Sequence, residues 1–349
     1  MGKLWNRAVA ASALFGLLAG VNPVMAKDKV VIGELNWTGA IAIQHILGEV
    51  IKTRLDGDVS YLAGDVPVLL AAAAKGDGSV DVVSDIWLPN QSAAWAKYVA
   101  GGTKSLVANK HPYIGVQGFY IPGYIQDKYN VHSVYDLKKP EVAKLFEPLG
   151  GGKSQLLVGP AGWESSYIGE IKAKDYGFSD KFESVSTEAS VTYAKLAAAY
   201  QREKGVVFYA YTPDWIFSAF DLRRLDEPAF DGYAQDNKKD DPLYKVDGCW
   251  KFISPTVDAD WLSKSKITCA FPDAKIYVLA SSTLQKRAPR IASFLENVAI
   301  DPNVINDLIL KIEKDKQPAD VVARTWVIAN PDIVDRWLVP SAEKVSSAQ

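Results

Sequence analysis

Four tryptophans each follow an apolar, strand-like run, and together they could hold a cation. Trp37 follows VVIGELN, Trp87 follows VDVVSDI, Trp163 follows LLVGPAG and Trp215 follows VVFYAYTPD. Several electron-rich indole faces around one cleft bind a cation too large and too weakly hydrated for a simple salt bridge. One such tryptophan is more often packing, but four in the same topological position favour a shared site. The pattern predicts a site for a quaternary ammonium or similar methylated onium compound.

Each of these tryptophans has a carboxylate within three residues of it: Glu34, Asp85, Glu164 and Asp214. An acid that points into the pocket favours choline or trimethylamine N-oxide, because it can bond to their oxygen or offset positive charge. A zwitterion such as glycine betaine needs donors instead, such as N–H groups at a helix N-terminus. Side chains next to a ligand contact also often point away from it. The ligand within the class therefore stays open, with Glu34 and Glu164 as the acids proposed to contact it.

Further aromatic and polar residues near the tryptophans are candidates to complete the site. Tyr113 begins an extended segment between the two halves of the chain, and we expect it to add a wall. Tyr209 and Tyr211 precede Trp215, but strand alternation turns about half of such side chains elsewhere. The candidates for polar contacts to a ligand oxygen are Asn36, Asn90 and Ser165.

The elements that must position these side chains alternate between strand-like and helix-like patterns. VVIGEL precedes IAIQHILGEVIKTRL, in which apolar residues recur at helical spacing, and QLLVGPAGW and VTYAKLAAAYQREKG continue the alternation. Such alternation predicts an α/β fold of mostly parallel sheets flanked by helices. Ligands of these sheets bind outside the carboxyl ends of the strands, where all four tryptophans lie.

The chain is predicted to form two lobes with a cleft between them. The extended segment PYIGVQGFYIP, at 112–122, crosses from one lobe to the other, and the last helices return to the first lobe. We therefore expect a discontinuous first lobe, residues 27–112 and 273–349, and a second lobe, residues 113–272.

Residues 1–26 have the pattern of a cleaved signal peptide. Lys3 and Arg7 form a positive start, an apolar stretch follows, and small residues near Ala26 suit a cleavage site. No cysteine follows the apolar stretch, so we expect a free periplasmic protein without a lipid anchor. Cleavage removes two basic residues and no acidic one, which takes the formal net charge from −2 to −4. This mildly acidic chain lacks the basic footprint of a nucleic-acid binder.

Two cysteines, Cys249 and Cys269, are the only ones in the chain. Export places both in an oxidising compartment, which favours a disulfide over the alternative of two buried thiols. Closing a loop of about 20 residues contributes about 3 kcal/mol on the chain-entropy model. The surrounding insert, at about 222–268, is acidic, but its spacing does not match a calcium loop. We expect a solvated loop without a metal ion.

An exported enzyme is the main alternative of another class. The three histidines, His45, His111 and His132, show no metal-binding pairing, and the chain has no G-x-S-x-G element to position a nucleophilic serine. GGGKS at 150–154 suggests a phosphate-binding loop, but the first glycine of that motif would fall at Glu147. We therefore expect a receptor without catalytic residues or a cofactor.

Three segments resemble signature stretches of the periplasmic substrate-binding proteins of ABC importers for glycine betaine, proline and related solutes. They are SDIWLPNQSAAWAKYV, VGPAGWESSY and YAYTPDWIF, and the C-terminal PADVVARTWVIANPDIVDRWL is similar to that family's closing helices. By position, Trp87, Trp163 and Trp215 match the family's aromatic box, and Trp37 is placed like a wall of choline-type relatives. The likeness covers essentially the whole chain after residue 26.

The resemblance implies a two-lobed Venus-flytrap receptor that closes on a trimethylammonium group. It also implies a monomer that docks on the inner-membrane permease of an ABC importer. Glycine betaine is the first ligand expected, and choline, carnitine, trimethylamine N-oxide and dimethylsulfoniopropionate belong to the same class. The alternatives are a receptor for proline or another small zwitterion without a methylated onium group, and an exported enzyme on the same fold.

Overall fold

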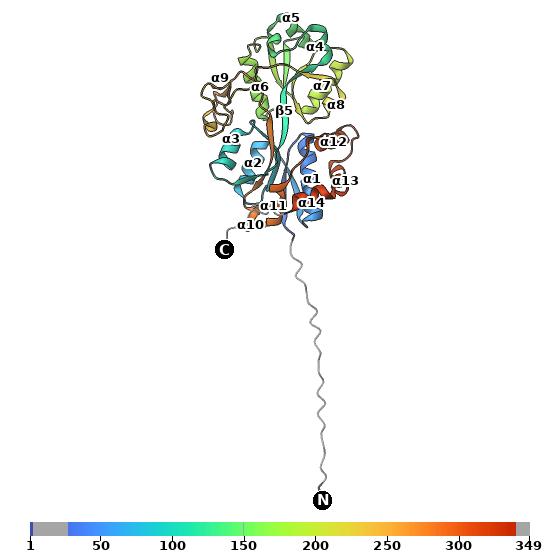
Figure 1. Cartoon of the computed structure of the whole chain (residues 1–349). Helices are drawn as coiled ribbons and strands as arrows, with labels where there is room; N and C mark the ends of the chain where they lie inside the picture. The colour runs from blue at the N-terminus through green and yellow to red at the C-terminus, as the bar shows by residue number, and fades with distance from the viewer. Residues whose placement is uncertain (3–26, 149, 340–349) are drawn as a thin grey trace.

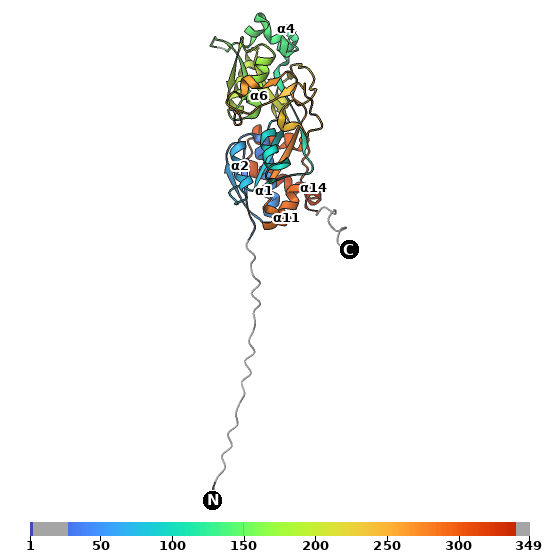
Figure 2. The ribbon, with the colours of Figure 1, turned by 90° about the vertical axis from the view of Figure 1, so that its left-hand side faces the viewer.

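The structure is a computed structural model that describes residues 1–2, 27–148 and 150–339. Two α/β lobes lie end to end, and long strands run through the centre of the molecule (Figure 1). The view turned by 90° shows the same two bodies (Figure 2). Nearly all of the predicted signal peptide, and the end of the predicted first lobe at 340–349, lie outside the described residues. We name the lobes by the bounds proposed from the sequence.

The first lobe is built on the parallel strands β1 (Lys29–Glu34), β2 (Asp58–Ala63) and β3 (Val82–Leu88). β12 (Ala274–Ser281) runs antiparallel to β3 and also pairs with β4 (Leu106–Ala108). β3 is buried almost throughout, as its continuous apolar run requires. The helices of this lobe are α1 (Thr38–Arg54), α2 (Val66–Lys75), α3 (Ser92–Trp95), η1 (Ala96–Ala100), α10 (Leu284–Arg287), α11 (Pro289–Asn297), α12 (Pro302–Glu313), α13 (Ala319–Ala329) and α14 (Pro331–Leu338).

The second lobe repeats the pattern around β6 (Ser154–Gly159), which is parallel to β7 (Phe182–Ser186) and β8 (Val207–Thr212). β5 (Tyr113–Pro122) is antiparallel to β8 and pairs with the short β9 (Leu222–Arg224). Its helices are α4 (Gly123–Tyr129), η2 (Val134–Lys138), α5 (Pro140–Ala143), η3 (Lys144–Phe146), α6 (Glu164–Asp175), α7 (Ala189–Gln201) and α8 (Ile216–Ala219). The two-lobed α/β fold predicted from the sequence is therefore confirmed.

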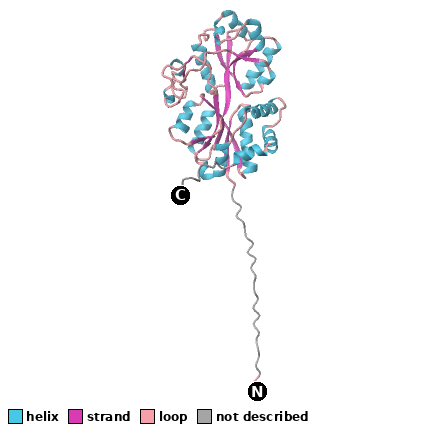
Figure 3. Cartoon of the chain, viewed as in Figure 1, coloured by secondary structure: helices cyan, strands magenta, loops and turns pink. Residues whose placement is uncertain are grey.

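The strand β5 belongs to both lobes. Its first residues, Tyr113–Gly115, pair with β12, and Val116–Tyr120 pair with β8. The strands consequently form one path of order β2-β1-β3-β12-β5-β8-β6-β7. Strands run through both lobes in the view coloured by secondary structure (Figure 3). The carboxyl ends of β1, β3, β6 and β8 meet where the lobes face each other, which is where the candidate site lies.

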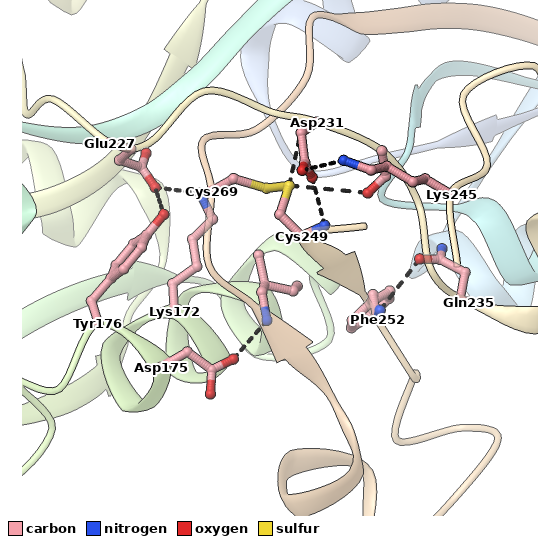
Figure 4. The surroundings of a disulfide bond; sticks show 12 residues. Lys172, Asp175, Tyr176, Glu227, Asp231, Gln235, Lys245, Cys249, Phe252 and Cys269 are labelled. Carbon is pink, nitrogen blue, oxygen red and sulfur yellow. Dashed lines mark hydrogen bonds and ion pairs between the residues drawn. A yellow bond between two sulfur atoms is a disulfide. The ribbon is translucent and has the colours of Figure 1, made fainter. Parts of the chain in front are cut away.

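The insert after β9 carries the predicted disulfide between Cys249 and Cys269, which is confirmed (Figure 4). Its regular elements are η4 (Asp236–Lys238), β10 (Trp250–Lys251), α9 (Trp261–Lys264) and β11 (Lys266–Ile267). Aspartates in this segment pair with lysines, such as Asp231 with Lys245. Over the described ranges, no group of three or more His, Cys, Asp or Glu residues could hold a metal ion. No helix within those ranges is long and apolar enough to cross a membrane.

Candidate functional site

A cavity lies between the two lobes. The first lobe contributes residues at the ends of β1 and β3 and at the start of α2, and the second lobe contributes residues at the β6–α6 turn and along β8. The side chains around the cavity are Trp37, Val66, Asp85, Ile86, Trp87, Asn90, Gln91, Trp163, Glu164, Ser165, Tyr209 and Tyr211. This lining contains five aromatic side chains and two carboxyl groups, but no Lys, Arg or His.

Four of these rings form a continuous arc, which we call the aromatic arc. The ring centroid of Trp37 lies 5.2 Å from that of Trp163, and the Trp163 ring lies 6.0 Å from that of Tyr211. Tyr211 in turn lies 5.0 Å from Trp87. All three contacts are edge-on or tilted, so adjoining rings turn their faces in different directions. Both lobes supply the arc, with Trp163 and Tyr211 from the second lobe standing between Trp37 and Trp87 from the first.

Asp85 lies near the end of β3 with a φ of 59°, a left-handed conformation that a residue with a side chain rarely adopts. One carboxyl oxygen accepts a hydrogen bond from Trp37 Nε1, and the other accepts one from the hydroxyl of Tyr113. Burial raises the pKa of Asp85, although both hydrogen bonds act in the opposite direction. The carboxyl group therefore orients one wall of the aromatic arc while it lines the cavity. Strained backbone of this kind concentrates at functional sites.

Glu164 is the first residue of α6, and its side chain is buried against the cavity, with 6% of the residue exposed. Its Oε1 accepts a hydrogen bond of 2.7 Å from Ser254 Oγ. Its Oε2 is buried and has no hydrogen-bond partner among the described residues. Burial raises the pKa of Glu164 to about 7, against the opposing effect of the Ser254 hydrogen bond. Near neutral pH this carboxyl group can therefore either donate or accept a hydrogen bond.

A buried amide network joins the lobes beside the cavity. Asn90 of the first lobe donates its Nδ2 to Gln117 Oε1 at 2.8 Å, and Gln117 Nε2 donates to Asn90 Oδ1 at 3.2 Å. The hydroxyl of Tyr209 also donates to Gln117 Oε1, at 2.6 Å. Because Gln117 is on the crossing strand β5, this network ties one wall from each lobe to the segment that connects them.

Four of the eight ligand contacts predicted from the sequence lie on the cavity: Trp37, Trp87, Trp163 and Glu164. Asn90 and Ser165, the further polar candidates, lie there too. Tyr113 is not on the cavity lining, but its hydroxyl donates a hydrogen bond to Asp85, a residue of the lining.

The other three predicted contacts lie away from the lining. Asn36 donates to Glu188 Oε2 at 3.3 Å, across the gap between the lobes. Glu34 faces His45, with 4.0 Å between Oε2 and Nε2. The ring of Trp215 packs against Tyr193, with centroids 5.7 Å apart, and against Phe220. Their contact with a ligand stays a prediction.

Tyr211 stands in the aromatic arc, although the sequence-based site set did not include it. Tyr209 and Tyr211 lie two residues apart on β8, so the alternation of a strand places them on the same face. That spacing was visible in VVFYAYTPD, but it did not reveal which face points to the cavity. In the sequence, Asp85 was noted only as one of four acids beside the tryptophans. Another of these acids, Asp214, accepts hydrogen bonds from Tyr193 and from the backbone N–H of Ile216.

Comparison with known proteins shows the family of this chain. Residues 28–329 match the family described as the substrate binding domain of ABC-type glycine betaine transport system. A trimethylamine N-oxide-binding protein of Pelagibacter ubique is 21% identical over 323 residues, which cover 90% of this chain and 92% of that protein. A glycine betaine-binding periplasmic protein of Dickeya dadantii is 27% identical over 154 residues, which cover 44% of this chain and 45% of that protein.

The fold is also similar to a solved structure. The closed, liganded lactococcal OpuAC complexed with glycine betaine superimposes with a TM-score of 0.66 and 19% identity, over 90% of this chain and 100% of that one. At this level of identity the likeness establishes the two-lobed fold. The family match, by contrast, spans most of the chain. The protein therefore belongs to the family of substrate-binding domains of ABC-type glycine betaine transport systems.

Proposed function

We propose that this protein is the periplasmic solute receptor of an ABC importer and that it binds a small methylated onium compound in the cavity between its lobes. The aromatic arc carries this proposal, because four rings contributed by both lobes surround a cavity that also holds two buried carboxyl groups. Aromatic faces attract the diffuse positive charge of a methylated nitrogen. The family match and the periplasmic relative support the same role.

Among ligands of this class we propose trimethylamine N-oxide ahead of glycine betaine, which the sequence-based ranking put first. The cavity lining has no basic side chain, and its two acids are Asp85 and Glu164. The carboxylate of glycine betaine or carnitine would find no cationic partner on this lining, and either acid would repel it when ionised. The oxygen of trimethylamine N-oxide instead accepts a hydrogen bond from protonated Glu164. The similarity to a trimethylamine N-oxide-binding protein over 90% of the chain is consistent with this choice.

Ligand binding and lobe closure are coupled in this proposal. A ligand inside the aromatic arc contacts Trp37 and Trp87 of one lobe and Trp163 and Tyr211 of the other. Only the closed arrangement provides all these contacts, so the ligand stabilises it over the open one. The closed monomer is then the form that docks on the inner-membrane permease, and the ligand is released chemically unchanged.

Calorimetry on residues 27–349 across a range of pH tests the function and the ligand together. The panel is trimethylamine N-oxide, choline, glycine betaine, carnitine, dimethylsulfoniopropionate and proline. Trimethylamine N-oxide needs the proton on Glu164, so its affinity should be constant below pH 7 and fall by up to about tenfold per pH unit above it. Choline, which gains from an ionised acid, should show the opposite trend.

Two outcomes would contradict the proposal at different levels. If no methylated onium compound bound, the receptor assignment would fail. If glycine betaine bound more tightly than trimethylamine N-oxide at every pH, the receptor assignment would stand and the role given to the acids would fail. Glu164→Gln separates the two levels further, because its amide still donates a hydrogen bond but does not titrate. It should bind trimethylamine N-oxide with no fall above pH 7.

A further inference from the structure

Ser254 connects the insert to the ligand cavity. It lies in the loop that the Cys249–Cys269 disulfide closes, and it is buried, with 3% of the residue exposed. Its hydroxyl donates to Glu164 Oε1 at 2.7 Å. The backbone N–H of Thr256 donates to the same hydroxyl oxygen at 3.3 Å. Ser254 Oγ also lies 2.9 Å from Thr256 Oγ1, and either hydroxyl of that pair can donate. When Thr256 is the donor, Ser254 Oγ accepts from Thr256 and its single proton goes to Glu164.

The insert is fixed along the length of α6, the helix that Glu164 begins. Lys174 Nζ donates to the backbone oxygens of Leu262 and Ser265 at 2.7 and 2.9 Å. Asp175 Oδ2 accepts the backbone N–H of Ile267 at 2.6 Å. A ring contact of 5.2 Å between Tyr167 and Trp261 adds an apolar attachment. These contacts join residues 261–267 of the disulfide loop to three positions along α6, so this part of the loop is held against the helix.

A buried ion pair holds the start of the insert to the same helix (Figure 4). Lys172 is fully buried and pairs with Glu227, which also accepts a hydrogen bond of 2.7 Å from the hydroxyl of Tyr176. The ammonium group of Lys172 lies 4.1 Å from the ring centroid of Phe271, at the end of the insert. The helix therefore holds the insert at both ends, and its own N-terminus meets Ser254 at the cavity.

We infer that Ser254 is a positioning residue of the ligand site, and that the insert serves to bring its hydroxyl to Glu164 so that the other carboxyl oxygen of Glu164 faces the ligand. The chemistry follows from the hydrogen bond itself. An oxygen that accepts the Ser254 proton acts as the carbonyl oxygen of the protonated acid, so the acidic proton resides on Oε2, which has no partner in the described structure. Ser254 thus determines which oxygen donates to an N-oxide. This inference rests on the proposed function.

Among the groups around Glu164, Ser254 is the one whose substitution is expected to change the pKa of Glu164. The other titratable groups on the cavity lining are Asp85 on β3 and Tyr209 and Tyr211 on β8. From the insert, the contact to Glu164 is Ser254 alone among the hydrogen bonds of the described residues. Removal of this hydrogen bond takes away support for the ionised carboxylate, and the pKa of Glu164 should rise.

The test is the pH profile of trimethylamine N-oxide affinity in Ser254→Ala, measured by calorimetry. A hydrogen bond to a carboxylate of about 1.5 kcal/mol corresponds to a midpoint about one pH unit higher than in the wild type. Below that midpoint the affinity should fall about twofold or more, because the proton is then shared between both oxygens. Ser254→Thr keeps the hydroxyl and should restore the wild-type midpoint. Ser263→Ala is the matched control, since among the described residues its hydroxyl donates to the backbone oxygen of Asp260, in the same loop, and not to Glu164.

A ligand-free measurement keeps the inference separate from the proposed function. The carbon-13 shift of the Glu164 carboxyl, followed by NMR across the same pH range, reports its titration directly. A higher midpoint in Ser254→Ala than in Ser263→Ala supports the positioning role even if the ligand is another onium compound. Equal midpoints in both variants would overturn the role, whatever ligand the wild type binds. Failure of the wild type to bind any member of the panel would overturn only the proposed function.

Discussion

The carboxyl group of Asp85 accepts the indole N–H of Trp37, a residue 48 positions earlier in the chain. A strand residue of the first lobe therefore sets the angle of a ring that follows another strand of the same lobe. The second carboxyl oxygen accepts the hydroxyl of Tyr113, on the strand that crosses between the lobes. Asp85 thus fixes one ring of the aromatic arc relative to the crossing strand β5.

Asp85→Ala should weaken both the fold and the site. It leaves two buried donors without an acceptor, at about 1–3 kcal/mol each, and it places alanine in a left-handed conformation at about 1–2 kcal/mol. We expect the free energy of unfolding to fall by about 3 kcal/mol or more and the ligand affinity to fall at least tenfold. Denaturant unfolding and calorimetry measure the two effects. Asp56→Ala is the matched control, because Asp56 has a φ of 56° but an exposed side chain. If both variants lost the same free energy of unfolding, the loss would come from the left-handed backbone alone, and the two hydrogen bonds to Asp85 would add no stability.

Trp163→Ala should reduce affinity for methylated onium ligands by about fivefold to thirtyfold. Its ring stands between Trp37 and Tyr211, and one cation–π contact contributes about 1–2 kcal/mol when water is excluded. Trp215→Ala should cost less affinity, because its ring packs against Tyr193 and Phe220. Calorimetry of the two variants compares them directly. An equal loss would place Trp215 on the ligand, as the sequence predicted.

Glu164→Gln should remove part of the pH dependence of stability. The pKa of Glu164 is raised from 4.5 to about 7 in the folded protein, so the folded state holds a proton that the unfolded state releases between these values. The contribution of Glu164 to the free energy of unfolding therefore falls as the pH rises from 4.5 to 7 and is constant above. At 1.4 kcal/mol per pH unit, this fall is about 3 kcal/mol.

Chemical denaturation at pH 4 and pH 8 measures this effect. The stability of Glu164→Gln relative to wild type should increase by about 3 kcal/mol between the two pH values. Asp214, whose pKa burial also raises to about 7, remains in both proteins and cancels in the comparison. A constant difference between wild type and variant at both pH values would mean that Glu164 titrates normally.

The ion pair of Lys172 and Glu227 should show strong coupling. Both side chains are buried, so the loss of one partner leaves an uncompensated charge, at about 3–5 kcal/mol. Lys172→Met and Glu227→Gln should each destabilise the protein by about this amount, and the double variant should lose much less than the sum. Lys239→Met, which removes an exposed pair with Asp236, should change the stability by less than about 1 kcal/mol. Additive losses in the buried pair would indicate that the two charges act independently.

The sequence was informative wherever a residue's place follows from periodicity. Strand-like apolar runs identified β1, β3 and β6, and helical spacing identified α1 and α7. The same runs placed Trp37, Trp87 and Trp163 at the carboxyl ends of those strands. The same pattern places Trp215 after the end of β8, but its ring is not on the cavity lining, and its contact with a ligand stays a prediction. Asp214 bonds to the backbone of Ile216 and to Tyr193, and the chain turns the indole toward Phe220.

Contacts that depend on irregular chain could not be predicted from local pattern. Ser254 lies 90 positions from Glu164 in the sequence and sits in an insert with little periodicity, so only the packed structure brings them together. The left-handed conformation of Asp85 could not be predicted from local pattern either. Its sequence, VDVVSDIW, predicts an ordinary strand, and the hydrogen bonds from Trp37 and Tyr113 explain why the acid is held in that place.

The edge contact between Trp37 and Trp163 gives the molecule an intrinsic spectroscopic signal of lobe closure. Two indoles whose centroids are 5.2 Å apart couple their electronic transitions, and these two belong to different lobes. A swing of one lobe away from the other would uncouple them. The circular dichroism of the unlabelled protein in the near ultraviolet can therefore follow opening and shutting in real time, with no dye attached.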